Sequence, residues 1–161
     1  MHYNMNTYTP AQALQPDEFL NSYLLRRILM AEPTSPKNLS GIVAASRSWY
    51  LLPKVPPHLG YLFAHLTYSE KLKIVIDTTN IWTMEFTNNP FYLPRACAAV
   101  FEGAQLTTSF ARATGWTTPI HYCPGCFMAQ LEQFGFVWFK RDWLISSRCE
   151  KHVRRQINCY Q

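Results

Sequence analysis

Two short pairs of potential metal ligands near the C-terminus constrain this chain more than any other feature. Cys123 and Cys126 are separated by two residues, Cys149 and His152 are separated by two residues, and 22 residues lie between the pairs. Four such side chains can surround one tetrahedral Zn²⁺ ion at about 2.0–2.3 Å from each ligand atom. The sequence therefore predicts one structural zinc ion in a compact module over residues 117–161, of the zinc-ribbon or treble-clef-like kind.

The choice of ligands leaves some alternatives. The five cysteines are an odd number, and no export signal precedes them, so a metal is favoured over disulfides. His152 is the preferred fourth ligand because a pair separated by two residues closes easily, but Cys159 could compete, and His121 is a more remote alternative. We expect Gly125 to ease the first turn by adopting a positive φ. Cys97, among small residues, is predicted to be buried outside the site.

Four protein ligands leave no open coordination position, which argues against a catalytic metal. The sequence has no H-x-E motif before P-C-x-x-C, as a nucleobase deaminase requires. It also lacks a Walker loop, a G-x-S-x-G motif and an H-E-x-x-H motif. We therefore expect a protein that is not an enzyme; a metal-dependent enzyme stays as an alternative that needs an open site.

The rest of the chain is predicted to be mainly α-helical. Apolar residues make up 48% and charged residues 16%, which excludes wholesale disorder, and no apolar run approaches the ~20 residues needed to span a bilayer. We expect a soluble, cytoplasmic protein with no membrane contact. Its predicted parts are a flexible arm at residues 1–15, a helical domain at residues 16–116 and the zinc-binding module at residues 117–161.

Apolar spacing and capping signals place the helices. Leu20, Leu24 and Ile28 form an apolar stripe on a helix that opens near Pro16. Thr67 and Glu70 have the spacing of a capping box. Further helices are expected over residues 39–50, 59–66, 70–80 and 104–113, with an irregular connection over 81–94. The pair within residues 59–80 is compatible with a helix-turn-helix, although simple packing is the commoner explanation.

Charge and aromatic content give the first indication of a partner. The net charge is +5, and residues 123–161 hold six basic and three acidic side chains. Basic residues flank the second ligand pair and are the candidates for DNA phosphate contacts, although a solvated basic face is equally compatible: Arg148, Lys151, Arg154 and Arg155. The aromatic residues between Phe134 and Trp143 are expected to form a strand or hairpin over a small core, in preference to a base-stacking platform.

The end of the chain resembles the TniQ family. The resemblance rests on Tyr122–Cys126, Trp138, Arg141, Trp143-Leu144, Cys149–His152 and Cys159, and on an N-terminal segment over residues 17–26 that is similar to the family's opening E-S-x-x-S-W/Y-L-x-R helix. Together these segments bracket nearly the whole chain.

The resemblance implies a helical N-terminal half, a zinc ribbon held by the four predicted ligands, and a non-enzymatic adaptor role in selecting the target site of DNA transposition. The implied partners are an AAA+ transposition regulator or a targeting complex, together with DNA, and a homodimer is an open possibility. The alternative is a zinc-containing transcriptional regulator of a mobile element that reads DNA with residues 59–80.

Overall fold

In a computed structural model of the chain, the described residues are 10–32, 39–44, 47–79, 92–104, 117–146, 148–152 and 157–158. They are mainly helical with little sheet, as predicted. The helices are α1 (Leu20–Ala31), α2 (Tyr68–Thr79), α3 (Tyr92–Phe101) and α5 (Pro124–Phe134), with 3₁₀ helices at Pro10–Gln12, Pro57–Phe63 and Arg141–Leu144. The strands are β1 (Ser48–Tyr50), β2 (Thr117–Pro119), β3 (His121–Tyr122) and β4 (Ile157–Asn158).

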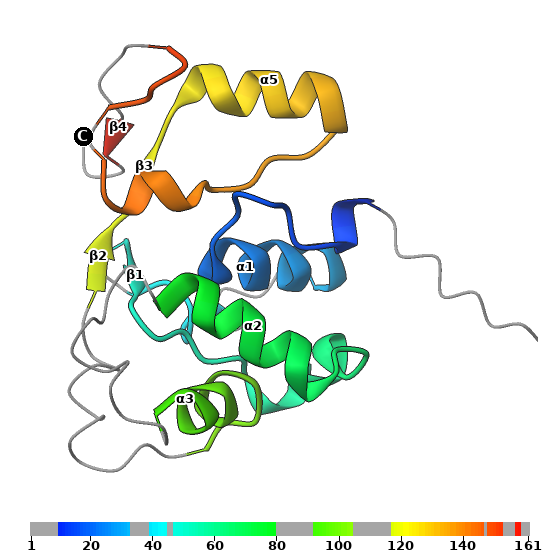
Figure 1. Cartoon of the computed structure of the whole chain (residues 1–161). Coiled ribbons are helices and arrows are strands. Elements are labelled where there is room, and N and C mark those ends of the chain that lie inside the picture. The colour runs from blue at the N-terminus through cyan, green and yellow to red at the C-terminus, as the bar shows by residue number, and fades with distance from the viewer. Residues whose placement is uncertain are drawn as a thin grey trace, which may run out of the picture.

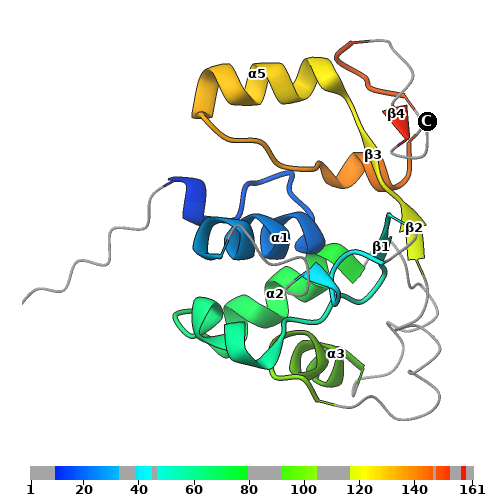
Figure 2. The same ribbon diagram turned by 180° about the vertical axis from the view of Figure 1, so that it is seen from behind.

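The helices lie in successive layers (Figures 1 and 2). Helix α5 occupies one end of the molecule, α1 the middle, and α2 with α3 the other end, while the chain after α5 returns between α5 and α1. One large apolar core is built around α1, and a smaller one surrounds three of the predicted ligands, Cys123, Cys126 and Cys149.

Helix α1 confirms the predicted apolar stripe. Leu20, Leu24 and Ile28 are almost completely buried, because residues four apart share one face of a helix. The helix begins at Leu20 rather than at Pro16, and Phe19 is its N-cap residue.

The prediction of a helix over residues 39–50 is wrong, because the chain turns there and forms a hairpin. Val43 bridges Trp49 in antiparallel fashion, and the Tyr50 N–H donates to the Ile42 carbonyl oxygen. Asn21 of α1 holds the second arm, since its side-chain amide donates to the Tyr50 carbonyl oxygen at 2.7 Å. A long-range hydrogen bond from α1 and the β-favouring residues of this segment outweigh its local helical pattern.

The prediction for residues 57–79 is partly confirmed. Residues 57–63 form a 3₁₀ helix rather than the expected α-helix, and two prolines stand at its start. The capping box before α2 is confirmed: the Glu70 carboxylate accepts the Thr67 N–H at 2.7 Å, and the Thr67 hydroxyl oxygen accepts the Glu70 N–H at 3.3 Å.

Helix α3 was not predicted, because Pro94 suggested an irregular connection. Proline is tolerated in the first turn of a helix, where its missing N–H has no intrahelical partner to lose. The signal that could have found α3 is the recurrence of apolar residues at Ala96, Cys97 and Val100, all completely buried. Cys97 is thus confirmed as a buried residue. Residues 80–91 of the expected connection and residues 105–113 of the expected helix over 104–113 lie outside the described part of the chain.

The segment from β2 to β3 joins the helical part to the C-terminal residues. Strand β2 pairs with β1, with Trp49 opposite Thr118, and β3 pairs with β4, with Tyr122 opposite Ile157. The predicted boundary at residue 117 therefore falls at the start of a strand that pairs with the preceding part of the chain. None of the described helices is long and apolar enough to cross a membrane.

The segment after α5 forms neither a long strand nor a hairpin. Within it, Lys140 makes an isolated bridge with Glu18, and a 3₁₀ helix follows at Arg141–Leu144. The expectation that its aromatic residues fill a core is confirmed for Trp138 and Trp143, which are 6% and 3% exposed.

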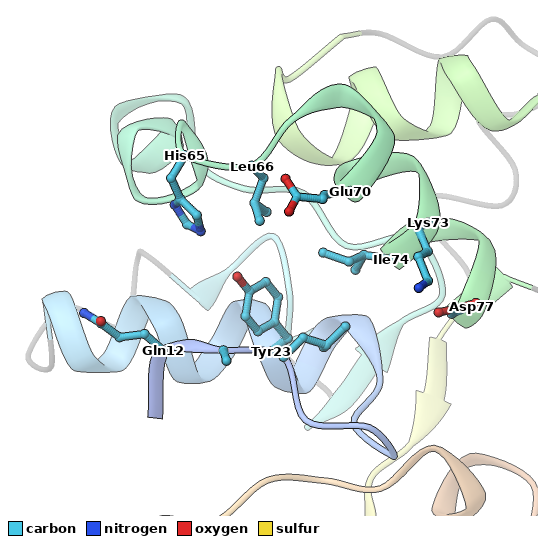
Figure 3. Close-up of a pocket in the computed structure, with 10 residues that line it drawn as sticks. Gln12, Tyr23, His65, Leu66, Glu70, Lys73, Ile74 and Asp77 are labelled. Carbon is cyan, nitrogen blue, oxygen red and sulfur yellow. The ribbon is translucent and has the colours of Figure 1, made fainter. Parts of the chain in front are cut away.

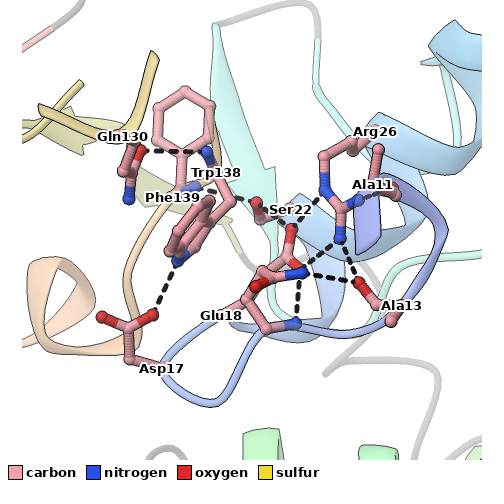
Figure 4. A network of polar contacts seen from close by, with 10 residues as sticks. Ala11, Ala13, Asp17, Glu18, Ser22, Arg26, Gln130, Trp138 and Phe139 are labelled. Carbon is pink, nitrogen blue, oxygen red and sulfur yellow. Dashed lines mark hydrogen bonds and ion pairs between the residues drawn. The ribbon is translucent and has the colours of Figure 1, made fainter. Parts of the chain in front are cut away.

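A polar seam fastens this segment to α1 (Figure 4). We use this name for the contacts of Asp17, Glu18 and Ser22 with residues 138–141, together with the ion pair between Glu18 and Arg26. The Ser22 hydroxyl oxygen accepts the Phe139 N–H at 2.8 Å, and the Asp17 carboxylate accepts the Trp138 indole N–H at 2.6 Å. The Arg141 N–H donates to the Asp17 carbonyl oxygen at 2.8 Å. The C-terminal part of the chain is therefore fixed to the start of α1.

Arg26 and Glu18 form the buried centre of the seam. Their side chains make an ion pair at 2.6 Å, and the Ser22 hydroxyl donates to the same carboxylate at 2.9 Å. The guanidinium also donates to the carbonyl oxygens of Ala11 and Ala13. Arg26 thus anchors residues 11–13, which belong to the arm predicted to be flexible.

Candidate metal centre

The four predicted ligands converge on one point. One ligand atom from each of Cys123, Cys126, Cys149 and His152 lies within 4.8 Å of all the others. The His152 Nδ1 is 3.4 Å from the Cys123 Sγ and 3.5 Å from both other thiols, and the Cys126 and Cys149 Sγ atoms are 3.5 Å apart. A tetrahedral ion with bonds of about 2.1–2.3 Å needs ligand atoms about 3.4–3.8 Å apart. The four side chains therefore fit a single metal ion.

Helix α5 positions the first pair of ligands. Cys123 is the N-cap residue, Pro124 starts the helix, and Cys126 lies in the first turn. The helix ends at Gly135, whose φ of 77° is the left-handed conformation that commonly terminates helices. A proline after Cys123 and a glycine after Phe134 are the signals that could have revealed α5. The first pair lies at a helix N-terminus, so the ribbon form of the module stays a prediction.

The second pair comes from the loop after the 3₁₀ helix Arg141–Leu144. Cys149 is buried in the smaller core together with Trp143. The ring of Phe127 in α5 packs edge-on against Trp143, with 5.4 Å between ring centroids. Aromatic packing thus brings the loop to the start of α5, where the two pairs meet.

Gly125 has a different role from the one predicted. Its φ is not positive, since the described glycines with positive φ are Gly103 and Gly135. A Cβ at position 125 would lie 2.9–3.1 Å from three ring atoms of His152. The missing side chain therefore leaves room for the imidazole, which is the reason for glycine between the two cysteines.

The thiols differ in their affinity for protons. Burial and the hydrogen bond with Cys149 raise the pKa of Cys126 to about 12. Burial alone would raise the pKa of Cys149, but its hydrogen bonds with His152 and the neighbouring thiols lower it to about 6. Metal ligation requires thiolates, so uptake of an ion would release protons from this cluster.

Of the two alternative ligands, His121 is described and Cys159 is not. The His121 Nδ1 lies 3.3 Å from the Trp143 carbonyl oxygen and does not join the four. Cys159 lies outside the described residues, as do two of the predicted phosphate contacts, Arg154 and Arg155. The other two, Arg148 and Lys151, are exposed on either side of Cys149.

A hollow of about 390 Å³ lies between α1 and α2, away from the four ligands (Figure 3). Tyr23 points into it from α1, and Leu66, Glu70 and Ile74 line the opposite side. Lys73 and Asp77 contribute one charge of each sign. Glu70 is held by the Thr67 N–H in the capping box. Among the described residues, neither the four metal ligands nor Arg148 and Lys151 line this hollow, so the cluster is the candidate site.

No protein-family model, curated protein or solved structure shows significant similarity to this chain.

Proposed function

We propose that this protein is a non-enzymatic accessory of DNA transposition, similar to the TniQ family, with one structural zinc ion. In this proposal it links a targeting element to an AAA+ regulator on DNA. The zinc ion holds the C-terminal module together, and the basic residues around the second ligand pair contact backbone phosphates.

The observation that carries the proposal is that both segments of the resemblance meet in one structure. Glu18, Ser22 and Arg26 lie together at the start of α1, because the Ser22 hydroxyl and the Arg26 guanidinium both donate to the Glu18 carboxylate. Ser22 accepts the Phe139 N–H and Glu18 bridges Lys140, so this group contacts residues 138–141, which belong to the C-terminal segment of the resemblance. Segments more than 100 residues apart thus form one structural unit, as expected if they were inherited together.

The ligand set supports zinc as the metal. Three thiols and one imidazole nitrogen at tetrahedral spacing are the soft and borderline donors that structural zinc sites use. All four positions are filled by protein, which suits a structural role. We expect the purified chain to contain one zinc ion per molecule.

The metal assignment is tested with a matched pair of cysteine variants. Cys149→Ser should lose the zinc and the ordered structure of the module, because binding and folding are coupled. Cys97→Ser removes a buried thiol outside the cluster and should keep one zinc ion. Elemental analysis and far-UV circular dichroism measure both. A Cys149→Ser variant with native metal content and an unchanged melting temperature would contradict the structural role.

DNA contact is tested by charge removal. The double variant Arg148→Ala, Lys151→Ala should weaken duplex binding and lower the slope of log K against log salt by about 2, as two phosphate contacts are lost. Lys54→Ala removes one exposed charge from the helical part and should leave the slope unchanged. A double variant that binds like the wild type would remove Arg148 and Lys151 from the proposal.

The adaptor role is tested by association with the AAA+ regulator of the same mobile element. Size-exclusion chromatography at low salt, with duplex DNA and ATP, should show a shared peak. No association under these conditions would contradict the adaptor role. A sequence-specific footprint by the chain alone would instead favour the transcriptional regulator. The charges of α2 give that alternative no support, since Glu70, Lys71, Lys73 and Asp77 cancel.

A further inference from the structure

A pocket of about 380 Å³ lies beside the metal cluster, at the polar seam. Its walls come from four places: the segment before α1, one side of α5 that includes Cys126, the segment at Trp138 and Lys140, and Lys151 with His152. Its polar and charged lining includes Asp17, Gln130, Lys140 and Lys151, and Trp138 lies among them.

Gln130 brings an unused hydrogen-bond donor to the pocket. Its side chain is only 5% exposed, and its Oε1 accepts the Trp138 N–H at 3.1 Å. Because a backbone N–H can only donate, this bond fixes which end of the amide is oxygen. The Nε2 is buried and has no hydrogen-bond partner among the described residues. Figure 4 shows this nitrogen turned away from the Trp138 N–H, toward the side on which Asp17 lies.

The charges around Gln130 favour an acceptor that carries a negative charge. Lys151 is exposed and reaches the pocket from the second ligand pair. The one carboxylate in the lining, Asp17, is already matched by the Lys140 ammonium at 2.6 Å and by the Trp138 indole N–H at 2.6 Å. The Lys151 ammonium and the Gln130 amide N–H groups are therefore the donors that a ligand's acceptor atoms could bind. A buried donor without an acceptor costs free energy, which a ligand oxygen would recover.

The rest of the lining is mainly apolar and includes Ala129, Phe134 and Trp138. A phosphodiester is surrounded by sugars and water and gains nothing from such walls. A carboxylate attached directly to an apolar group satisfies both parts of the pocket. When the C-terminal residue of a polypeptide has an apolar side chain, its α-carbon carries both a carboxylate and an apolar group. A small organic acid also combines a carboxylate with an apolar group.

We infer that this pocket binds a carboxylate carried by an apolar group, with the Gln130 Nε2 and Lys151 as its donors. This inference goes beyond the proposed function, although the pocket shares Lys151 with the proposed phosphate contacts and is lined by two of the predicted zinc ligands, Cys126 and His152. The pocket would give the protein a second recognition surface beside the metal-holding loop.

The experiment follows ligand binding by the ¹⁵N-labelled, zinc-loaded full chain in NMR titrations. The probes are N-acetyl-leucine, its neutral amide, inorganic phosphate, and the tetrapeptide Ala-Ala-Ala-Leu with a free or an amidated end. N-acetyl-leucine should shift the Gln130 side-chain NH₂ and Trp138 indole resonances in a saturable manner, with a Kd of about 1 mM or below, as expected for a fragment of this size. The neutral amide should not.

Two variants test the donors. Gln130→Glu keeps the acceptor for the Trp138 N–H but replaces the donor with a negative oxygen, so binding should weaken at least about tenfold. Lys151→Gln is an exposed change that should leave the fold intact, and it should weaken binding several-fold. If Gln130→Glu fails to fold, the inference is still tested by Lys151→Gln and by comparing N-acetyl-leucine with its neutral amide.

The outcomes separate the alternatives. A free-ended tetrapeptide that binds at least about tenfold better than N-acetyl-leucine supports a polypeptide chain end. Equal or weaker peptide binding assigns the pocket to a small organic acid and still supports the carboxylate. The inference would be overturned if N-acetyl-leucine and its neutral amide caused equal shifts, or if inorganic phosphate caused shifts equal to those of N-acetyl-leucine. It would also be overturned if no probe caused a saturable shift of the Gln130 resonances.

Discussion

Gly125 and Gly135 stand at opposite ends of α5 and are glycine for opposite reasons. At Gly125 the backbone is ordinary, but the His152 ring fills the space that a side chain would need. At Gly135 the space is open, with nothing within 4 Å of an added Cβ, but the φ of 77° is unfavourable for other residues. One position is restricted by a neighbouring ligand and the other by backbone geometry.

This difference predicts distinct effects of alanine at the two positions. Gly125→Ala should weaken zinc affinity roughly tenfold, since displacing a ligand ring acts like the loss of a contact that orients it. Gly135→Ala should lower the free energy of unfolding by about 1 kcal/mol and leave zinc affinity unchanged. Chelator competition and thermal unfolding measure the two effects. A Gly125→Ala variant with unchanged zinc affinity would contradict the role given to His152.

Asp17 makes the seam sensitive to acid. Partial burial alone would raise its pKa, but hydrogen bonds from Lys140 and Trp138 outweigh this and hold the pKa below the usual value. Because the folded pKa is lower than the unfolded one, the ionised group contributes stability above about pH 4, and this is lost as the pH falls through the folded value.

Asp17→Asn should therefore reduce stability at pH 7 but matter less in acid. We expect a loss below about 1 kcal/mol, because the carboxylate is partly exposed to solvent. The difference from the wild type should shrink below about pH 4, as followed by urea unfolding at several pH values. Asp142→Asn, an exposed change in the segment after α5, controls for the loss of one negative charge. A constant difference at all pH values would contradict this account.

At the scale of elements, Ser22 is the residue of α1 that hydrogen-bonds directly to the segment after α5. Its hydroxyl donates to the Glu18 carboxylate and accepts the Phe139 N–H, so one small side chain connects the ion pair to the returning chain. The residue is 2% exposed, and water cannot replace these bonds.

Ser22→Ala should lower the free energy of unfolding by about 1–3 kcal/mol, because the Phe139 N–H is left without its acceptor. Ser69→Ala, an exposed change in the first turn of α2, should stay within about 0.5 kcal/mol of the wild type. Chemical denaturation of both variants measures the difference. Equal stabilities would mean that the seam does not depend on this hydroxyl.

At the scale of the whole molecule, Phe139 joins the two apolar cores. Its ring lies 5.1 Å from that of Trp49 in the large core and 5.1 Å from that of Phe127 beside the metal cluster. The helical part and the metal centre are therefore expected to gain stability from each other.

Phe139→Ala should lower the free energy of unfolding by about 3–5 kcal/mol and also speed the loss of zinc to a chelator. Ile145→Ala, which truncates a side chain 71% exposed, should change neither. Calorimetry and stopped-flow chelation report the two parts separately. A variant that loses stability but releases zinc at the native rate would show that the cores are independent.

Local signals in the sequence determined the parts of the protein that need few distant partners. The spacing of the cysteines and His152 predicted the cluster, because each pair lies within one turn of chain and thiolates suit few other roles at that spacing. The stripe of α1 and the Thr67–Glu70 box were predicted because residues three or four apart meet within a helix.

Only the tertiary structure decided the rest. The hairpin at residues 42–50 depends on the amide of Asn21, and the segment after α5 depends on Ser22 and Asp17. These partners lie from about 20 to more than 100 residues away, so no local window of sequence contains both. The pocket at Gln130 has the same origin, since four separate stretches form it. Burial and hydrogen bonding between distant segments, which local propensity does not encode, placed these residues together.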